Sequence, residues 1–356
     1  MGVKHERIKI EGPMDLERHT GRGHAREKTV AEVLLGAIEL PSIGSLLVAD
    51  DAHEFVAQGL QGDQTNMEQY WRVATDHHGA SAWPSGGPHD AATLRLSKDK
   101  VAFEMAIHAV ASVLKPQAPL WVYGANDEGI KSAAKKMTPL FRDVETIDTR
   151  RHCRVIRGFR SEPCETLLPR LDDWAQEVQL EHPNGPVSHR VYPGIFAKGQ
   201  LDPATNLLLQ AMPTPDEGAR VLDYACGAGV IGGELKRRQP TIDLMLIDAD
   251  AIAIVATQQN VSGSATRVEA NPLAISDAAP FDLIVSNPPI HEGKERDYQT
   301  VKRLIESAAR HLKPGAPLWM VVQRQVPVAE HLNTHLAGAL CVKSDGRFNV
   351  WRAVRA

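Results

Sequence analysis

The sequence of 356 residues lacks an apolar run that approaches the ~18 residues a membrane-crossing helix needs. Its opening stretch, MGVKHERIKI, has no apolar signal-peptide core. It also misses the myristoylation pattern, because Glu6 stands where that pattern requires Ser or Thr. From these absences we expect a cytoplasmic protein that does not associate with membranes.

Cysteine is scarce, and no two cysteines form a CxxC pair. The four are Cys153, Cys164, Cys226 and Cys341. Neither a zinc site nor a disulfide framework is therefore predicted. The histidines His77, His78 and His89 are candidate metal ligands, but no second cluster at a useful spacing supports them. We predict no metal site.

A net positive charge is also absent: the formal charge is −4, so the chain as a whole is not a basic nucleic-acid binder. Residues 131–160 differ, with nine Lys and Arg against three acidic residues, a local charge of +6. Such a run is more often a solvated face. The alternative is a patch that attracts a phosphate backbone, with Arg151, Arg154 and Arg157 as candidate RNA-binding residues.

One eight-residue phrase is present twice. Residues 114–121 read LKPQAPLW and residues 312–319 read LKPGAPLW, with seven letters identical. Apolar residues at helical spacing precede each copy, over 101–114 and 300–312. Lys-Pro then ends the helix, because proline cannot continue it. An apolar run follows each phrase, so each copy predicts helix, tight turn and buried strand of an α/β sheet.

The likeness extends beyond the phrase. Residues 149–158 match 344–353 as the turn and last strand of a β-hairpin, and 44–52 resemble 218–226. We therefore expect two copies of one α/β domain, over 1–165 and 191–356, with a connector at 166–190. The first copy has no glycine loop, which predicts that it has lost ligand binding.

The second copy contains VLDYACGAGVIGG at 221–233, a strand followed by a glycine-rich turn and the start of a helix. Gly227 and Gly229 let the backbone approach a ligand, and the helix start offers free N–H groups. Dinucleotide sites share a GxG turn, so this alone is weak evidence. An acid at the end of the next strand, Asp248, is placed to accept ribose hydroxyls. Asp223 beside the turn can face a cationic amino-acid group, which favours S-adenosylmethionine over NAD.

Residues 281–290 read FDLIVSNPPI, an apolar strand followed by Asn-Pro-Pro. A plain turn is the simpler interpretation. The chemistry favours a methyl-acceptor site, because an amine conjugated to a base or an amide is a poor nucleophile until acceptors hold its two N–H groups. The Asn287 side-chain oxygen and the Pro288 carbonyl can accept them, while Pro288 and Pro289 stiffen the loop beforehand.

Four stretches together carry a resemblance to a known family: 192–209, 221–232, 286–293 and 346–353. The chain resembles the bacterial ribosomal RNA guanine-N2 methyltransferases, and best those of the small ribosomal subunit. The resemblance implies an α/β fold of two tandem Rossmann-like class I methyltransferase domains, the N-terminal one degenerate and the C-terminal one active. It also implies S-adenosyl-L-methionine as cofactor and ribosomal RNA or a ribosomal subunit as partner.

The family's site residues transfer by position. Asp223, Gly227 and Gly229 would line the methionine part of the cofactor. Asp248 would hold the ribose, Asn271 would lie near the adenine, and Phe196 would help to close the pocket. The target base would meet Asn287, Pro288, Pro289 and Ile290. The family usually has an aromatic residue at this last position, where stacking is worth roughly 1–3 kcal/mol per base; Phe348 or His291 could supply a ring instead.

Several alternatives stay open. The acceptor could be a large-subunit ribosomal RNA, adenine N6, or a protein glutamine, because these enzymes share the Asn-Pro-Pro signature. A non-catalytic RNA-binding assembly factor is a further alternative. The degenerate first domain could serve as an RNA platform or only brace the second, and the oligomeric state is left open.

Overall fold

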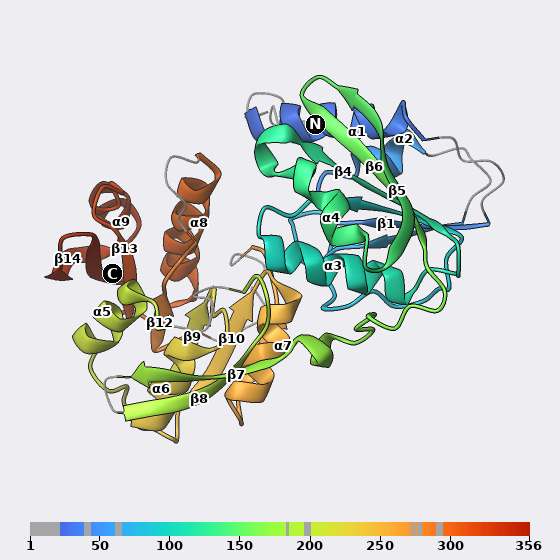
Figure 1. Ribbon diagram of the computed structural model, residues 1–356. Helices are drawn as coiled ribbons and strands as arrows, with labels where there is room; N and C mark the ends of the chain where they lie inside the picture. Colours follow the sequence, from blue (N-terminus) through green and yellow to red (C-terminus); the bar gives the residue numbers. More distant parts are fainter. Residues whose placement is uncertain are drawn as a thin grey trace, which may run out of the picture.

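The computed structural model describes residues 22–38, 44–60, 66–182, 185–195, 201–271, 275, 280–289 and 295–356. These residues form two α/β domains that lie beside one another, the first drawn in blue to green and the second in yellow to red (Figure 1). No helix in the described ranges is long and apolar enough to cross a membrane.

The first domain is a six-stranded sheet in which four parallel strands are followed by an antiparallel hairpin. The strand order is β2 (Asn66–Tyr70), β1 (Ser45–Ala49), β3 (Ala91–Arg95), β4 (Pro119–Ala125), β6 (Cys153–Arg160) and β5 (Phe141–Arg150). The α-helices are α1 (Arg22–Leu35), α2 (Phe55–Gly59), α3 (Lys100–Ser112) and α4 (Ala133–Met137), with short 3₁₀ turns η2 (Asn126–Glu128) and η3 (Ile130–Ser132).

The second domain repeats this order and adds one edge strand. Its sheet runs β11 (Ala265–Val268), β10 (Asp243–Asp248), β9 (Arg220–Tyr224), β12 (Leu283–Ser286), β13 (Pro317–Gln323), β15 (Phe348–Val354) and β14 (Ala337–Ser344). The helices are α5 (Pro203–Ala211), α6 (Val230–Arg238), α7 (Ala251–Asn260), α8 (Glu295–His311) and α9 (Ala329–His335). The hairpin that the sequence predicts at the end of each copy is present in both.

The central parallel strands of both sheets are buried on both faces, as parallel strands covered by helices are. In β4, Leu120 and Val122 pack into one apolar cluster, while Trp121 and Tyr123 pack into the cluster on the other face. Residues 318–321 of β13 divide between two clusters in the same alternating way. This explains why the repeated phrase leads into continuous apolar runs rather than alternating ones.

The repeated phrase forms the same turn in both domains. Gln117 and Gly315, the one position at which the two copies differ, both have a left-handed backbone, with φ of 64° and 77°. The Gln117 N–H donates to the Arg160 carbonyl at 2.9 Å, and the Gly315 N–H donates to the Arg355 carbonyl at 2.8 Å. The turn therefore requires this conformation whichever residue occupies it.

The segment between the domains contains a 3₁₀ turn, η4 (Leu171–Trp174), and a hairpin of β7 (Gln176–His182) and β8 (Gly185–Val191). The hairpin lies across the second domain (Figure 1). Asn260 of α7 fixes it, accepting from the Arg190 N–H at 2.7 Å and donating to the Arg190 carbonyl at 2.9 Å. On α6, the buried Glu234 lies 3.2 Å from Nδ1 of His182.

The difference between the two turns predicts a stability effect. A left-handed conformation costs an L-residue about 1–2 kcal/mol, and glycine avoids that cost while losing more entropy on folding. Gln117→Gly should therefore stabilise the first domain by ~0.5–1 kcal/mol in urea unfolding. Gly315→Ala is the matched opposite: a Cβ there meets nothing within 4 Å, so its expected destabilisation is purely conformational. A loss of stability in Gln117→Gly would contradict this account of the turn.

Candidate active site

The predicted site lies where the parallel strands β9, β10 and β12 end, and ligands of open α/β sheets bind at this edge. The glycine-rich turn after β9 contains three left-handed residues, Ala225, Gly227 and Gly229, with φ of 57°, 56° and 78°. Gly229 begins the approach to α6, and a Cβ there would lie 2.8 Å from Val261. The turn therefore packs closely against Val261, and its backbone faces the carboxyl edge of the sheet.

Asp248 ends β10 beside this turn. One carboxylate oxygen accepts the Gly227 N–H and the other accepts the Asp250 N–H, both at 2.9 Å. Burial raises the pKa of Asp248 to about 6, and the nearby Asp250 carboxylate also raises it. The turn and the carboxylate are therefore fixed relative to each other, and the role of Asp248 in holding a ribose stays a prediction.

Asp223 is fully buried in β9. Its Oδ2 accepts the Gly232 N–H of α6 at 2.8 Å, while Oδ1 has no hydrogen-bond partner among the described residues. Burial raises the pKa of Asp223 to about 7, and Asp248 adds to that rise. A buried acceptor without a donor fits a cationic ligand such as the sulfonium and ammonium of S-adenosylmethionine.

Asn287 follows β12, and its orientation is set by two residues that the sequence did not single out. Its Nδ2 donates to the Asp202 carboxylate and to the Thr205 hydroxyl, each at 2.9 Å. A carboxylate can only accept, so the amide nitrogen must face Asp202 and the amide oxygen is left to face a substrate. Asp202 is also the N-cap of α5, accepting from the Thr205 N–H at 2.9 Å. Asp-Pro before an apolar helix was the available signal for this cap.

The remaining predicted site residues are placed as follows. Pro288 is buried and Pro289 is exposed. The Asn271 N–H donates to Glu269 at 3.0 Å, and the Glu269 N–H donates to the Asp248 carbonyl at 2.8 Å, which ties the segment after β11 to the backbone of Asp248. Phe196, Ile290 and His291 lie outside the described residues.

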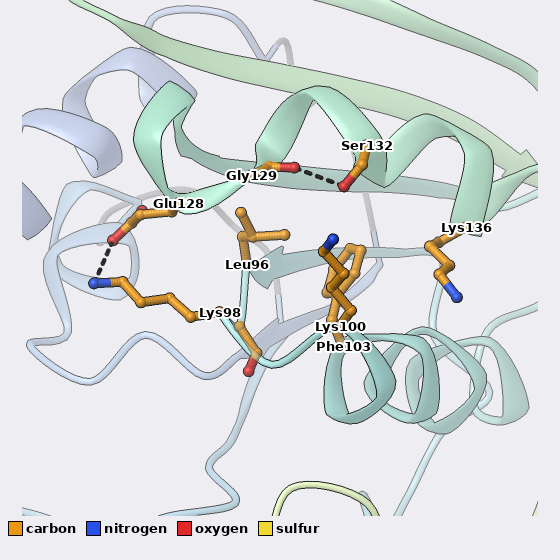
Figure 2. A pocket seen from close by; sticks show the side chains of 9 residues that line it. Leu96, Lys98, Lys100, Phe103, Glu128, Gly129, Ser132 and Lys136 are labelled. Atoms are coloured by element: carbon orange, nitrogen blue, oxygen red, sulfur yellow. Dashed lines mark hydrogen bonds and ion pairs between the residues drawn. The ribbon is translucent and has the colours of Figure 1, made fainter. Parts of the chain in front are cut away.

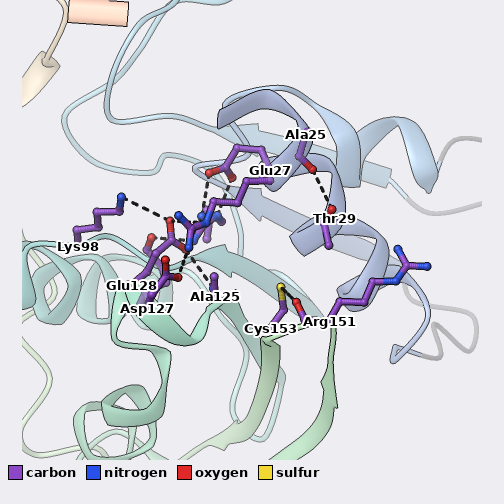
Figure 3. Close-up of polar contacts among 12 residues, drawn as sticks. Ala25, Glu27, Thr29, Lys98, Ala125, Asp127, Glu128, Arg151 and Cys153 are labelled. Carbon is purple, nitrogen blue, oxygen red and sulfur yellow. Dashed lines mark hydrogen bonds and ion pairs between the residues drawn. The ribbon is translucent and has the colours of Figure 1, made fainter. Parts of the chain in front are cut away.

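The first domain has lost each of these groups. The strand register places Val48, Trp71 and Arg95 at the positions of Asp223, Asp248 and Asn287. Arg95 is held by Glu27 of α1 at 2.8 Å and by Glu128 at 2.7 Å, in the network of Figure 3. This ion-pair network occupies the position that corresponds to Asn287, so the first domain lacks an amide there. Its loss of ligand binding stays a prediction.

A shallow hollow does remain at this edge of the first domain, beside the ion-pair network. Lys98, Lys100 and Lys136 line it together with Phe103 and Ser132 (Figure 2). Lys98 lies 3.8 Å from Glu128, and Lys136 pairs with Glu104 of α3. The hollow is cationic at its rim but partly neutralised.

The three arginines predicted to bind RNA lie on or beside β6, and each contacts a neighbouring side chain. Arg151 pairs with Glu32 of α1 at 2.5 Å and Arg157 pairs with Glu145 of β5. Arg154 donates to Asn126 at 2.9 Å. The basic character of this segment is thus reduced by local ion pairs, and its role in RNA binding stays a prediction.

Comparisons with known proteins agree with the two-domain architecture. Residues 45–177 match the family model "Methyltransferase small domain N-terminal", and residues 187–352 match "Methyltransferase small domain". Among solved structures, the chain is similar to the "T. Thermophilus 16S rRNA N2 G1207 methyltransferase (RsmC) in complex with AdoMet and Guanosine". The TM-score is 0.80 at 19% identity over 92% of each chain, which shows a shared fold.

Curated relatives are closer in sequence. The Ribosomal RNA small subunit methyltransferase C of Pseudomonas fluorescens is 34% identical over 92% of this chain and 99% of its own length. The protein of the same name from Pseudomonas syringae pv. tomato is 32% identical over the same shares. Matches of this extent span both domains.

The chain is therefore an S-adenosylmethionine-dependent methyltransferase with two tandem Rossmann-like domains, of which the N-terminal one is degenerate. Within that class it belongs to the ribosomal RNA small subunit methyltransferase C family. The resemblance, the fold class and the cofactor predicted from the sequence are confirmed.

Because its neighbours fix the orientation of the Asn287 amide, we expect substitutions here to lower the rate of catalysis without weakening cofactor binding. Asn287→Ala should lower kcat by ~10²–10³, the scale of losing one preorganised polar group, and leave S-adenosylmethionine affinity nearly intact. Thr205→Val keeps the helix cap, which uses the backbone N–H, but removes the hydroxyl that accepts from Asn287 Nδ2, so we expect a smaller fall of ~10-fold. The measurement is steady-state methyl transfer alongside calorimetric cofactor binding. Full activity of Asn287→Ala would exclude the proposed role of this side chain.

Proposed function

We propose that the chain transfers a methyl group from S-adenosylmethionine to the exocyclic N2 amine of a guanine in small-subunit ribosomal RNA. The observation that carries the proposal is the Asn287 amide, whose nitrogen is held by Asp202 and Thr205 so that its oxygen is the acceptor for a substrate N–H. The relatives named above act, by their names, on small-subunit ribosomal RNA, and the T. thermophilus enzyme is described with guanosine.

The mechanism follows from what a conjugated amine needs. Bound S-adenosylmethionine supplies an electrophilic methyl group on its sulfonium. The two N–H groups of the guanine amine would donate hydrogen bonds to the Asn287 oxygen and the Pro288 carbonyl. This geometry would turn the nitrogen lone pair toward that methyl carbon. As the N–C bond forms, the S–C bond breaks and its electron pair stays on sulfur. The methylated amine is acidic and loses one proton, so no strong general base is required.

The target base must leave its stack to reach this site, at a cost of a few kcal/mol. Contacts between the protein and the surrounding RNA offset that cost. Arg151, Arg154 and Arg157 remain our candidates for such contacts, and the lysines around the hollow of the first domain are a second cationic surface. Either surface would contact phosphates without reading sequence. Because the substrate is ribosomal RNA, we place this activity in the cytoplasm.

The experiment is methyl transfer from radiolabelled S-adenosylmethionine to naked ribosomal RNA, small subunits, large subunits and tRNA, followed by digestion to nucleosides. We expect label in N2-methylguanosine from small-subunit RNA, and ~10²–10³-fold slower labelling with Asn287→Ala. Label in large-subunit RNA would assign the chain to the sister reaction. Label in adenosine, or none in any RNA despite measured cofactor binding, would contradict the proposed acceptor.

A further inference from the structure

The two domains meet through the carboxyl ends of equivalent strands, β2 in the first and β10 in the second. Val73 and Asp250 pair as an isolated antiparallel bridge. The Ala74 N–H donates to the Ala249 carbonyl at 2.8 Å, and the Ala251 N–H donates to the Arg72 carbonyl at 3.0 Å. The first domain is therefore bonded directly to Ala249 and Ala251, which flank Asp250 just after the predicted ribose carboxylate Asp248.

A side-chain pair strengthens this junction. The Arg72 guanidinium donates to both carboxylate oxygens of Asp250, with Nη2 to Oδ2 at 2.7 Å and Nε to Oδ1 at 3.1 Å. The two side chains are only 13% and 17% exposed, so solvent screens the pair weakly. On the other side, Asp50 of the first domain accepts the Arg72 N–H at 3.0 Å. Arg72 is thus fixed at its backbone and at its side chain.

Asp250 transmits this contact to the cofactor site. Its N–H donates to the Asp248 carboxylate at 2.9 Å, and its own carboxylate caps α7 by accepting the Ile252 N–H at 2.9 Å. Without the Arg72–Asp250 pair, Asp250 would lose its side-chain anchor to the first domain. The Asp250 N–H would then no longer be held in place where it bonds the Asp248 carboxylate.

The same short segment of the first domain also reaches the methyl-acceptor side. Asp76 accepts a hydrogen bond from Arg303 of α8 at 2.8 Å, and α8 begins shortly after Asn287-Pro-Pro. Gly194 is packed so closely on Arg72 that a Cβ would lie 2.6 Å from its Nη1. Residues 72–76 therefore contact elements on both sides of the site.

We propose that Arg72 of the degenerate domain is a positioning residue for S-adenosylmethionine binding, and that it acts through Asp250 on Asp248. The proposal rests on the proposed function only in so far as Asp248 holds the cofactor ribose. It gives the first domain a role in cofactor affinity that is independent of RNA.

The test measures S-adenosylmethionine Kd by calorimetry without RNA, together with KM and kcat, for Arg72→Gln, Asp250→Asn and the double variant. Asparagine can still cap α7, so Asp250→Asn removes the ion pair without removing the cap. We expect each single variant to raise Kd and KM about 10-fold, the lower end for residues that orient ligand-binding groups, with kcat nearly unchanged at saturating cofactor. The double variant should bind no more weakly than either single variant, because both remove one interaction.

Lys115→Gln is the matched control, because it removes an ion pair to Asp90 at 2.6 Å at the opposite edge of the first sheet. It should leave Kd within about two-fold of the parent value. Arg72→Lys, which keeps the charge but loses the two-pronged contact, should restore part of the affinity. Unchanged Kd in both single variants, or effects that multiply in the double variant, would overturn the proposal. Absence of RNA methylation by the parent protein would bear on the proposed function and not on this cofactor measurement.

A separate observation concerns Glu306 of α8 with His331 and His335 of α9. Their ligand atoms all lie within 4.8 Å of one another. His331 Nε2 lies 3.8 Å from the Glu306 carboxylate and has no hydrogen-bond partner among the described residues. The two histidines are four positions apart and therefore share one face of α9. The sequence analysis found no metal site because Glu306 is far from both histidines along the chain.

We infer that this cluster binds a divalent transition metal such as Zn²⁺, with two imidazoles and one carboxylate as protein ligands and water completing the shell. Two histidines and one acidic residue are an established donor set for zinc. His335 is exposed, so it can move inward by the small distance that bonds of ~2.0–2.2 Å require. The ion would link α8 to α9.

The test uses tag-free protein dialysed against chelator and titrated with Zn²⁺, with Co²⁺ absorption as a report of coordination. We expect one equivalent bound, a higher melting temperature with metal, and at least 10-fold weaker binding in His331→Asn and Glu306→Gln. The control His152→Asn alters an exposed histidine in the first domain and should change nothing. Equal Zn²⁺ binding by the parent and both variants, or no binding by the parent at micromolar protein, would overturn the inference.

Discussion

The carboxylate of Asp248 is the group on which the rest of the site depends. It is bonded on one side to the glycine turn through Gly227 and on the other to the start of α7 through Asp250. Both contacts are backbone N–H groups, so they fix the carboxylate without occupying a side chain that the ligand needs. A carboxylate held this way keeps lone pairs for a ligand, which we predict to be a ribose, while its burial raises the pKa of Asp248 to about 6. The Glu269 N–H on its carbonyl extends the same frame toward the predicted adenine position.

The duplication kept the scaffold and changed the chemistry. At the amino edge of each sheet the same bonds persist: Asp90 pairs with Lys115 in the first domain, and Asp282 pairs with Lys313 at 2.8 Å in the second. At the carboxyl edge, the first domain replaces the acceptor asparagine by Arg95 and closes the space with two glutamates. The two domains therefore share their strand order and the bonds of the amino edge, while the carboxyl edge, where ligands of such sheets bind, has diverged in its side chains.

The sequence predicted those features that are local or repeated. The glycine turn, Asp248 and Asn287 stand at strand ends, and the repeated phrase defined the helix-turn-strand unit around them. The contacts it missed join distant segments: Asp202 reaches Asn287, and Arg72 reaches Asp250. Spacing along one chain carries no signal for such pairs, because the sheet order that brings them together is a property of the fold. For the same reason, the ion pair of Arg151 could not be predicted from the basic segment 131–160, because its partner Glu32 of α1 lies far away in sequence.

The junction between the domains gives the first domain a structural role that does not require a ligand site of its own. Its backbone bonds are symmetric: the strand register makes Arg72 equivalent to Ala249, and each contributes a carbonyl to the other domain. The side chains are not symmetric. Arg72 pairs with Asp250, whereas the equivalent residues in the opposite domains, Ala249 and Val73, carry no charge. Two identical domains with Arg and Asp at these positions would form the pair twice, once in each direction. In this chain it forms once, and it places the Arg72 charge of the degenerate domain on Asp250, two residues after Asp248, the predicted ribose-binding carboxylate.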